Sequence, residues 1–356
     1  MNKITTLIIT LPLILLGAQW QSLDGPPAGR ADDMSIGEYE SEWVIYAADK
    51  DHRLYKSENL GDSWDSVYTH DSVINPTCVI TEENNAQIIY IGRWAPNGRC
   101  VLKSENGGDN WDYHDSGITN KNPLCFAMDP NDVDIIYLGC KQNDSQSEMF
   151  KTTDGGDEWS SLSDFPDYTV NEIAIRPNYP ETLVAATEDG VYFTGDGGTN
   201  WYKRLNKSSI TSVSYGSEDV VYAGRHESDE GLFKSTNGGA SWNYNPIGNF
   251  VVVTAVAAVN ASELYIAASG NDGQGIYRTT NGGTNWTYYG REDSLFCNDK
   301  ILKILIDPDY SSSHLVYVAG EWAIYKFNAS TEQWKELNKG FKLKNIKSNH
   351  ISIHSK

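Results

Sequence analysis

The chain of 356 residues is short of positive charge, with 28 Lys and Arg against 48 Asp and Glu and a formal net charge of −20. This deficit argues against nucleic acid or an anionic membrane surface as the partner, because both repel an acidic protein. The sequence also lacks any segment with a sustained helical period. Its short apolar runs, bounded by Gly, Asn and Asp-Pro, are typical of strands instead.

Long hydrophobic runs are almost absent. The main one, residues 4–16, is shorter than the roughly 20 residues of a membrane span. It follows Lys3 and precedes Gly17-Ala18, the order of a secretory signal peptide with a small-residue cleavage point. We therefore expect residues 1–18 to be a signal peptide, no membrane span in the mature protein, and a secreted, periplasmic or cell-surface location.

Cysteine is scarce, with five residues and no Cys-x-x-Cys pair, which disfavours a zinc site. Export permits disulfides. Cys125–Cys140 would close one hairpin, and Cys100–Cys140 would join neighbouring loops; the sequence leaves both pairings open. The odd count leaves at least one thiol free. The histidines show no metal-binding spacing, no Gly-x-Ser-x-Gly elbow occurs, and the Gly-Gly pairs are not followed by Lys-Ser/Thr. We expect no metal, no cofactor and no catalytic residues assembled by a known motif.

What the chain does contain is an eight-residue pattern: Ser/Thr, any, Asp/Asn, any, Gly, any, any, Trp. The Asp/Asn side chain is expected to accept backbone N–H bonds two or three residues on, the Gly to supply a positive φ, and the Trp to bury its ring at the start of the next strand. The key residues of the six full copies, with the Trp of a worn seventh, are Ser57, Asn59, Gly61, Trp64; Ser104, Asn106, Gly108, Trp111; Thr152, Asp154, Gly156, Trp159; Thr194, Asp196, Gly198, Trp201; Ser235, Asn237, Gly239, Trp242; Thr279, Asn281, Gly283, Trp286; and Trp334.

Successive tryptophans of this pattern are 41 to 48 residues apart, a period that favours propeller blades of several short strands. The pattern resembles the Asp-box, or BNR repeat, of sialidases, xyloglucanase-type glycosidases, sortilin-type receptors and secreted BNR-like propellers. That resemblance implies an all-β, seven-bladed β-propeller. It implies little about function, because in those families the box is a structural turn remote from the binding site.

The predicted propeller covers residues 33–340, with an N-terminal edge strand in 19–32 and a further strand in 341–356. These ends leave an alternative of eight blades, or of a truncated longer propeller. In each repeat we expect an inner strand, a second strand ending near Tyr, a third strand, the box and a fourth strand.

Loops between second and third strands gather at one mouth of a propeller channel, so a ligand site is expected there. The candidates in these loops are Arg93, Trp94, Arg225, His226, Glu321 and Trp322, which offer guanidinium, indole and carboxylate groups to a glycan or peptide. The alternative is that these are solvated loop residues.

The favoured function is a non-catalytic binding or scaffold module that recognises a glycan or peptide at the channel mouth. The sialidase Arg-Ile-Pro motif is absent; Ile175-Arg176-Pro177 occupies a strand-ending turn instead. Two alternatives stay open. One is a glycoside hydrolase, which needs two carboxyl groups about 5–10 Å apart across a sugar site. The other is an assembly factor for a membrane complex, as in photosystem-assembly relatives of these repeats.

Overall fold

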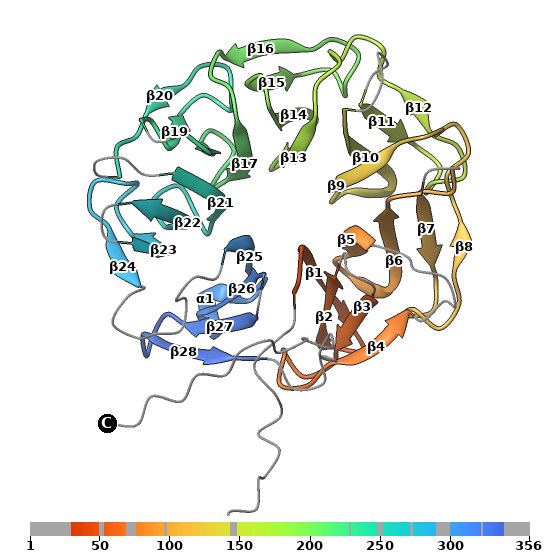
Figure 1. The fold of residues 1–356 in the computed structure, drawn as a ribbon, viewed down its shortest axis with the longest axis horizontal. Coiled ribbons are helices and arrows are strands. Elements are labelled where there is room, and N and C mark those ends of the chain that lie inside the picture. The colour runs from red at the N-terminus through yellow and green to blue at the C-terminus, as the bar shows by residue number, and fades with distance from the viewer. Residues whose placement is uncertain are drawn as a thin grey trace, which may run out of the picture.

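The computed structural model describes residues 30–49, 53–68, 76–95, 98–142, 148–227, 229–247, 252–270, 273–289, 300–321 and 323–337. They form seven four-stranded antiparallel sheets arranged as blades around a central channel (Figure 1). The predicted seven-bladed β-propeller is confirmed. The predicted signal peptide, the N-terminal edge strand apart from residues 30–32, and the strand in 341–356 lie outside the described residues.

Each blade consists of four strands that are consecutive in the sequence and run from the channel outward. Blades 1 to 4 comprise β1 Asp33–Tyr39, β2 Glu42–Asp49, β3 Arg53–Ser57, β4 Asp65–Tyr68; β5 Pro76–Glu82, β6 Asn85–Arg93, β7 Val101–Ser104, β8 Asp112–Tyr113; β9 Asn122–Asp129, β10 Asp132–Lys141, β11 Met149–Thr152, β12 Ser160–Ser161; and β13 Val170–Arg176, β14 Tyr179–Thr187, β15 Val191–Thr194, β16 Tyr202–Leu205.

Blades 5 to 7 comprise β17 Ile210–Tyr215, β18 Val221–Arg225, β19 Leu232–Ser235, β20 Asn243–Tyr244; β21 Val252–Ala258, β22 Leu264–Gly270, β23 Gly273–Thr279, β24 Thr287–Tyr289; and β25 Ile301–Ile306, β26 Leu315–Gly320, β27 Ile324–Asn328, β28 Gln333–Glu336. The single-turn helix α1, Tyr310–Ser313, lies between β25 and β26. This helix was not predicted, since one turn is too short to show a helical period in the sequence.

The recurrent pattern forms a compact turn between the third and fourth strands, which we call the box turn. In blade 5, Gly239 N–H donates to Ser235 Oγ (2.9 Å) and Ser241 N–H donates to Asn237 Oδ1 (2.9 Å). The Asn side chain thus accepts from four residues on, rather than two or three, while the hydroxyl accepts the glycine N–H. Gly239 has φ +98°, which favours glycine.

The box tryptophans are not buried alike. Trp64, Trp159 and Trp201 are 2–7% exposed, whereas the other four are half-buried. Trp64 Nε1 donates to Leu337 O (2.9 Å), so it reaches from blade 1 to the end of blade 7. Trp242 Nε1 instead donates to Gly239 O of its own turn (3.0 Å). The indole N–H of Trp64 therefore ties two blades, whereas that of Trp242 braces its own turn.

Buried tyrosines of the second strands also join adjacent blades. Tyr46, Tyr90 and Tyr137 are at most 2% exposed, and their hydroxyls donate to Ala86 O, Gly155 O and Gly197 O of the following blade, at 2.8, 2.8 and 3.2 Å. Each hydroxyl satisfies a buried polar group while its ring fills the space between sheets. The strand register places each tyrosine at the blade surface. Its hydroxyl then holds the following blade in position through a backbone carbonyl.

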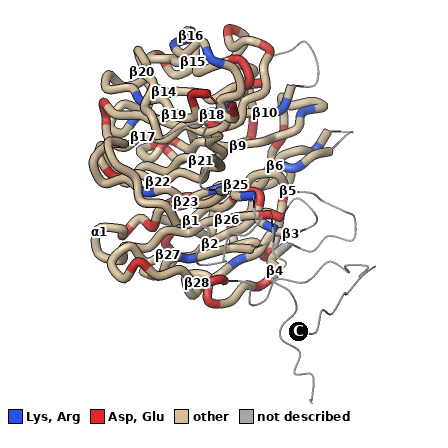
Figure 2. Tube along the Cα trace, turned by 60° about the vertical axis from the view of Figure 1, so that its left-hand side comes forward, with Lys and Arg blue, Asp and Glu red and all other residues tan. Residues whose placement is uncertain are grey.

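The two faces of the ring differ in charge. The face with the box turns and the turns between first and second strands is rich in acids, among them Glu82, Glu83, Asp132 and Asp134. Basic segments lie instead near the ends of β6 and β10, where second strands lead into the opposite face (Figure 2). Among the described residues, no helix has the length and apolarity to cross a membrane.

Candidate functional site: the channel mouth

One position recurs in all seven innermost strands, and we call the seven residues the channel ring. Each is paired across to a small residue of the second strand, Ala or Gly. In six blades the ladder shifts register just before this position, which re-aims the side chain. The channel ring consists of Asp33, Cys78, Cys125, Glu172, Ser212, Ala255 and Lys303.

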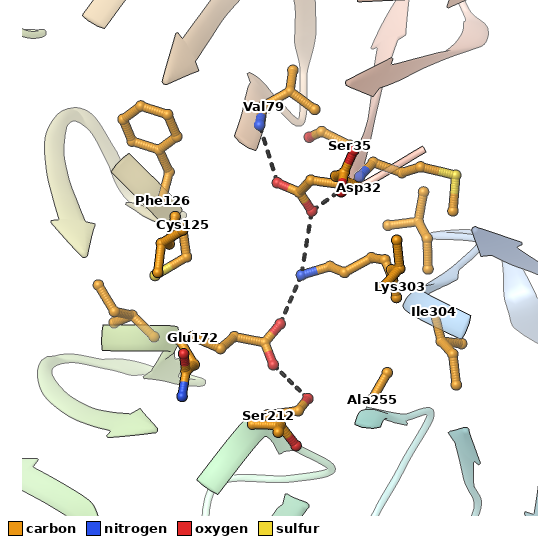
Figure 3. Close-up of a pocket in the computed structure, with 18 of the residues that line it drawn as sticks. Asp32, Ser35, Val79, Cys125, Phe126, Glu172, Ser212, Ala255, Lys303 and Ile304 are labelled. Carbon is orange, nitrogen blue, oxygen red and sulfur yellow. Dashed lines mark hydrogen bonds and ion pairs between the residues drawn. The ribbon is translucent and has the colours of Figure 1, made fainter. Parts of the chain in front are cut away.

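Lys303 links three blades across the channel (Figure 3). Its Nζ lies 2.7 Å from Glu172 Oε1 of blade 4 and 3.6 Å from Asp33 Oδ1 of blade 1. The side chains of Lys303, Glu172 and Asp33 are 29, 18 and 13% exposed, so the ion pairs are largely shielded from water. One ammonium therefore lies between two carboxylates.

Both carboxylates also accept hydrogen bonds from the neighbouring blade. Val79 N–H donates to Asp33 Oδ2 (3.0 Å), and Val213 N–H donates to Glu172 Oε2 (3.0 Å). Ser212 Oγ donates to the same Glu172 oxygen (2.5 Å). Each carboxylate thus joins two adjacent blades as well as binding Lys303.

Burial raises the pKa of Asp33, against the opposing effects of Lys303 and the Val79 N–H. Burial disfavours the charge on Lys303 too, but the carboxylates of Glu172 and Asp33 outweigh it and raise the pKa of this lysine. Lys303 is therefore cationic at neutral pH, and its ammonium does not act as a proton donor at that pH.

The channel ring surrounds a cavity of about 250 Å³ that is lined by all seven inner strands. A second cavity, of about 200 Å³, lies between blades 5, 6 and 7, and Thr254 lines both. The other polar residues that line the second cavity are His226, Ser269, Gln274 and Lys300. We call this second cavity the mouth pocket. Together they offer donors and acceptors along a concave path leading into the channel.

The structure distributes the predicted site residues among separate places. His226 lines the mouth pocket. Arg225 is only 8% exposed; its Nη1 pairs with Asp229 (2.6 Å) and its Nε donates to Ser208 O (3.0 Å), so its guanidinium is committed within blade 5. Glu321 forms an ion pair with Arg30 (3.7 Å) beside the channel.

Arg93 ends β6 of blade 2 and Trp94 follows it, whereas Arg225 ends β18 of blade 5 and His226 follows it. Blades 2 and 5 lie on opposite sides of the ring (Figure 1). Trp94 is 54% exposed, and the Arg93 guanidinium lies over the Tyr113 ring of the outermost strand. Trp322 lies outside the described residues. The matching sequence positions of Arg93 and Arg225 therefore do not correspond to one shared site.

Neither predicted disulfide is formed: Cys78, Cys100, Cys125 and Cys140 are free, buried thiols. Cys125 pairs with Gly139, so Cys140, one residue on, faces the other side of the sheet. Cys125 packs in the core between blades 3 and 4, and Cys140 packs with Cys100 between blades 2 and 3. Burial raises the pKa of Cys100 to about 12. Cys297 lies outside the described residues.

The sequence reasoning missed the channel charges. Their only signal was a single charged residue within an apolar inner strand, as in Ile301–Ile306, where Lys303 stands between Leu302 and Ile304. In the described part of the chain, no group of three or more His, Cys, Asp or Glu could hold a metal ion.

No model of a known protein family matches the sequence, and no curated protein matches it. Among solved structures, the GH74 xyloglucanase from Xanthomonas campestris is similar with a TM-score of 0.70 at 15% identity, over 88% of this chain and 55% of that one. An ancestral GH74 enzyme gives 0.68 at 16% identity, over 88% and 47%. The chain thus spans about half the length of these enzymes.

Propellers of nearly equal coverage are also similar. YCF48 from Cyanidioschyzon merolae gives a TM-score of 0.59 at 14% identity, over 84% of this chain and 94% of that one. A structure of YCF48 bound to D1 peptide gives 0.60 at 16% identity, over 84% and 92%. At these identities the likeness shows the fold alone.

Proposed function

We propose that this protein is a non-catalytic binding module that takes an extended peptide segment of a protein partner at the channel mouth. The observation that carries the proposal is the position of Lys303 between Asp33 and Glu172. The two channel carboxylates that could serve as an acid and a base are engaged with an ammonium and with backbone donors.

The mouth pocket supplies what a peptide main chain and its polar side chains need. His226 and Lys300 contribute a ring nitrogen and an ammonium, and Ser269 and Gln274 contribute neutral donors and acceptors. Thr254, which lines this pocket, is tied to the next blade, because its Oγ1 donates to Ile301 O (3.0 Å). A pre-formed concave surface binds with less loss of entropy than one that must order.

A solved propeller of similar size, YCF48, is recorded with a bound peptide, which supports the peptide class. We extend this to a secreted or otherwise exported setting on the basis of residues 1–18, whose pattern is that of a signal peptide. The box turns, in this proposal, are BNR-type structural corners with no part in binding.

The test is a peptide-display selection on the intact protein, followed by calorimetry with an enriched peptide. Lys300→Ala and His226→Ala are expected to weaken binding by about 1.4 kcal/mol or more, tenfold in Kd. Arg225→Ala serves as a matched control, because its guanidinium is turned into blade 5. Selection of glycans instead of peptides on an equivalent array would overturn the peptide class.

A glycoside hydrolase is the second candidate. Asp33 Oδ1 and Glu172 Oε1 both contact Lys303 Nζ, so these oxygens can be no farther apart than the sum of the two contact distances, 3.6 and 2.7 Å. That limit allows the separation of roughly 5–5.5 Å found in retaining glycosidases. Against it, the ammonium occupies the space where a sugar would react. The third candidate, an assembly factor for a membrane complex, would bind a peptide segment of a membrane protein in the same way. Co-purification with membrane proteins would favour it.

A further inference from the structure

Blade 2 carries a cationic and aromatic cluster at its outer edge, away from the channel axis. We call it the rim patch; it consists of Arg93, Trp94, Arg99 and Tyr113. Arg93 ends β6, Arg99 precedes β7 and Tyr113 ends the outermost strand β8. The guanidinium carbons of Arg99 and Arg93 lie 4.4 and 5.4 Å from the centre of the Tyr113 ring. Two cations therefore share one aromatic ring.

The rim patch is held in place by its own backbone. Arg93 Nε donates to Arg99 O (2.6 Å), and Arg93 N–H donates to Cys100 O (2.9 Å). Arg99 has φ +64°, a left-handed conformation that is uncommon for a residue with a side chain. These contacts hold both guanidiniums over Tyr113, which is 41% exposed. Trp94, which follows Arg93 in the chain, is 54% exposed.

The rim patch also differs from most other arginines of the chain. Arg30, Arg176, Arg225 and Arg278 each pair with a carboxylate at 2.6–2.9 Å. Among the described residues, no ion pair is formed by Arg93 or Arg99. Burial raises the pKa of the Asp115 carboxyl, and the charges of Arg99 and Arg93 act in the opposite direction.

We propose that the rim patch binds an acidic polysaccharide, with a uronate carboxylate on the guanidiniums and a sugar ring on Trp94. Guanidinium groups bind carboxylates through two parallel hydrogen bonds, and their charge persists at any physiological pH. The exposed indole offers an apolar face to a pyranose ring, which an acidic peptide does not need. The protein's net charge of −20 would repel a polyanion elsewhere, so binding is confined to this patch.

This proposal is independent of the peptide site, because the rim patch lies on blade 2 and the mouth pocket on blades 5 to 7. The probes are an oligogalacturonate and a neutral xylogluco-oligosaccharide of matched length, titrated by calorimetry into the intact protein. The wild type is expected to bind only the oligogalacturonate, more weakly as salt rises. Arg99→Ala and Trp94→Ala are each expected to weaken it at least tenfold. Arg99→Lys, which keeps the charge but loses the planar fork, is expected to be intermediate.

Blade 4 provides the matched control. Arg204 lies 5.1 Å from the centre of the Tyr202 ring, which is 51% exposed on an outer strand. Arg204→Ala removes an equivalent arginine and tyrosine contact and is expected to leave oligogalacturonate binding unchanged. Equal losses in Arg204→Ala and Arg99→Ala would overturn the proposal, as would no binding by a folded wild type. Equal binding of oligoglutamate, insensitive to Trp94→Ala, would replace the glycan with an acidic peptide.

Discussion

The seam between blades 4 and 5 and the seam between blades 7 and 1 join the same kind of sheets by different means. In the first, Asn171 Nδ2 donates to Ile210 O (2.7 Å), and Glu172 accepts from Val213 N–H. In the second, the position of Asn171 is taken by Leu302, which cannot donate, and Lys303 reaches Asp33 only at 3.6 Å.

The closing seam is secured farther out. Trp64 donates to Leu337 O, Lys326 Nζ donates to Leu60 O (3.0 Å), and both Lys326 and Lys335 pair with Asp62. A continuous chain joins blades 4 and 5, whereas blades 7 and 1 meet without a covalent link in the described residues. The closure of the ring therefore rests on non-covalent contacts, among them a buried indole and a channel ion pair, which the following variants test.

The largest effect is expected from Trp64→Ala. Loss of a buried indole in a core typically costs about 3–5 kcal/mol, and Trp64 is 2% exposed within the blade 1 and blade 7 core. Trp242→Ala is the matched control, because this half-buried indole bonds only to its own turn. Trp242→Ala should lower the free energy of unfolding, measured in urea, by about half as much as Trp64→Ala does. Equal losses would mean that the closing seam is no more dependent on its tryptophan than the others.

Lys303→Met should have the next largest effect, about 1–2 kcal/mol, less than for a fully buried pair because the lysine is 29% exposed. Lys303→Met with Glu172→Gln should recover part of the loss, since no unpaired Glu172 carboxylate then remains. The pKa of Lys303 is raised in the folded state. Its stabilisation is therefore fully present below the ordinary lysine pKa and is lost as pH rises through the folded value.

The pH arm of this experiment is a series of urea titrations of wild type and Lys303→Met. The difference between their unfolding free energies should stay constant from about pH 7 to 9 and shrink only in strong alkali. A difference that disappears between pH 7 and 9 would contradict a lysine held charged by two carboxylates.

Thr211→Val should have a smaller effect, about 1 kcal/mol, because it removes the hydroxyl that donates to Val253 O (2.9 Å) with little change of shape. Thr254→Val, in the next seam, should match it within error. Since the closing seam has Leu302 at this position, Leu302→Val should cost less than either threonine change, and thermal melts of the three variants would show whether it does.

The four described thiols should be protected in the native protein. Burial raises the pKa of Cys78, Cys100, Cys125 and Cys140, so little thiolate exists to react. An alkylating reagent should label these thiols only once the protein is unfolded, and no reductant should be needed. Peptide mass analysis would locate the labels. A Cys125–Cys140 linked peptide would contradict the opposite orientation of these side chains.

The ring itself was predictable because each blade repeats a strong local signal. The glycine turn and the following tryptophan recur at 41 to 48 residues, and the second-strand tyrosines, such as Tyr46 and Tyr90, mark the buried strands. Such periodic signals act over a few residues, so they survive in the sequence alone.

The site was harder to predict, because it depends on which residues meet across the ring. Lys303 and Glu172 are 131 positions apart, and no local pattern relates them. The matching sequence positions of Arg93 and Arg225 led to a wrong prediction of one shared site, because a local likeness was taken for a likeness in space. Asp229 and Ser208 engage one arginine, and Tyr113 stacks with the other, so equivalent backbone positions carry different surroundings.

The most direct test of the account is to assay wild type and Glu172→Gln for hydrolysis of aryl glycosides and of xyloglucan. If the channel carboxylates are structural ties, neither protein turns over substrate above the buffer blank, while the variant unfolds at lower urea. Turnover by the wild type that Glu172→Gln abolishes would contradict the account and make the channel a catalytic site.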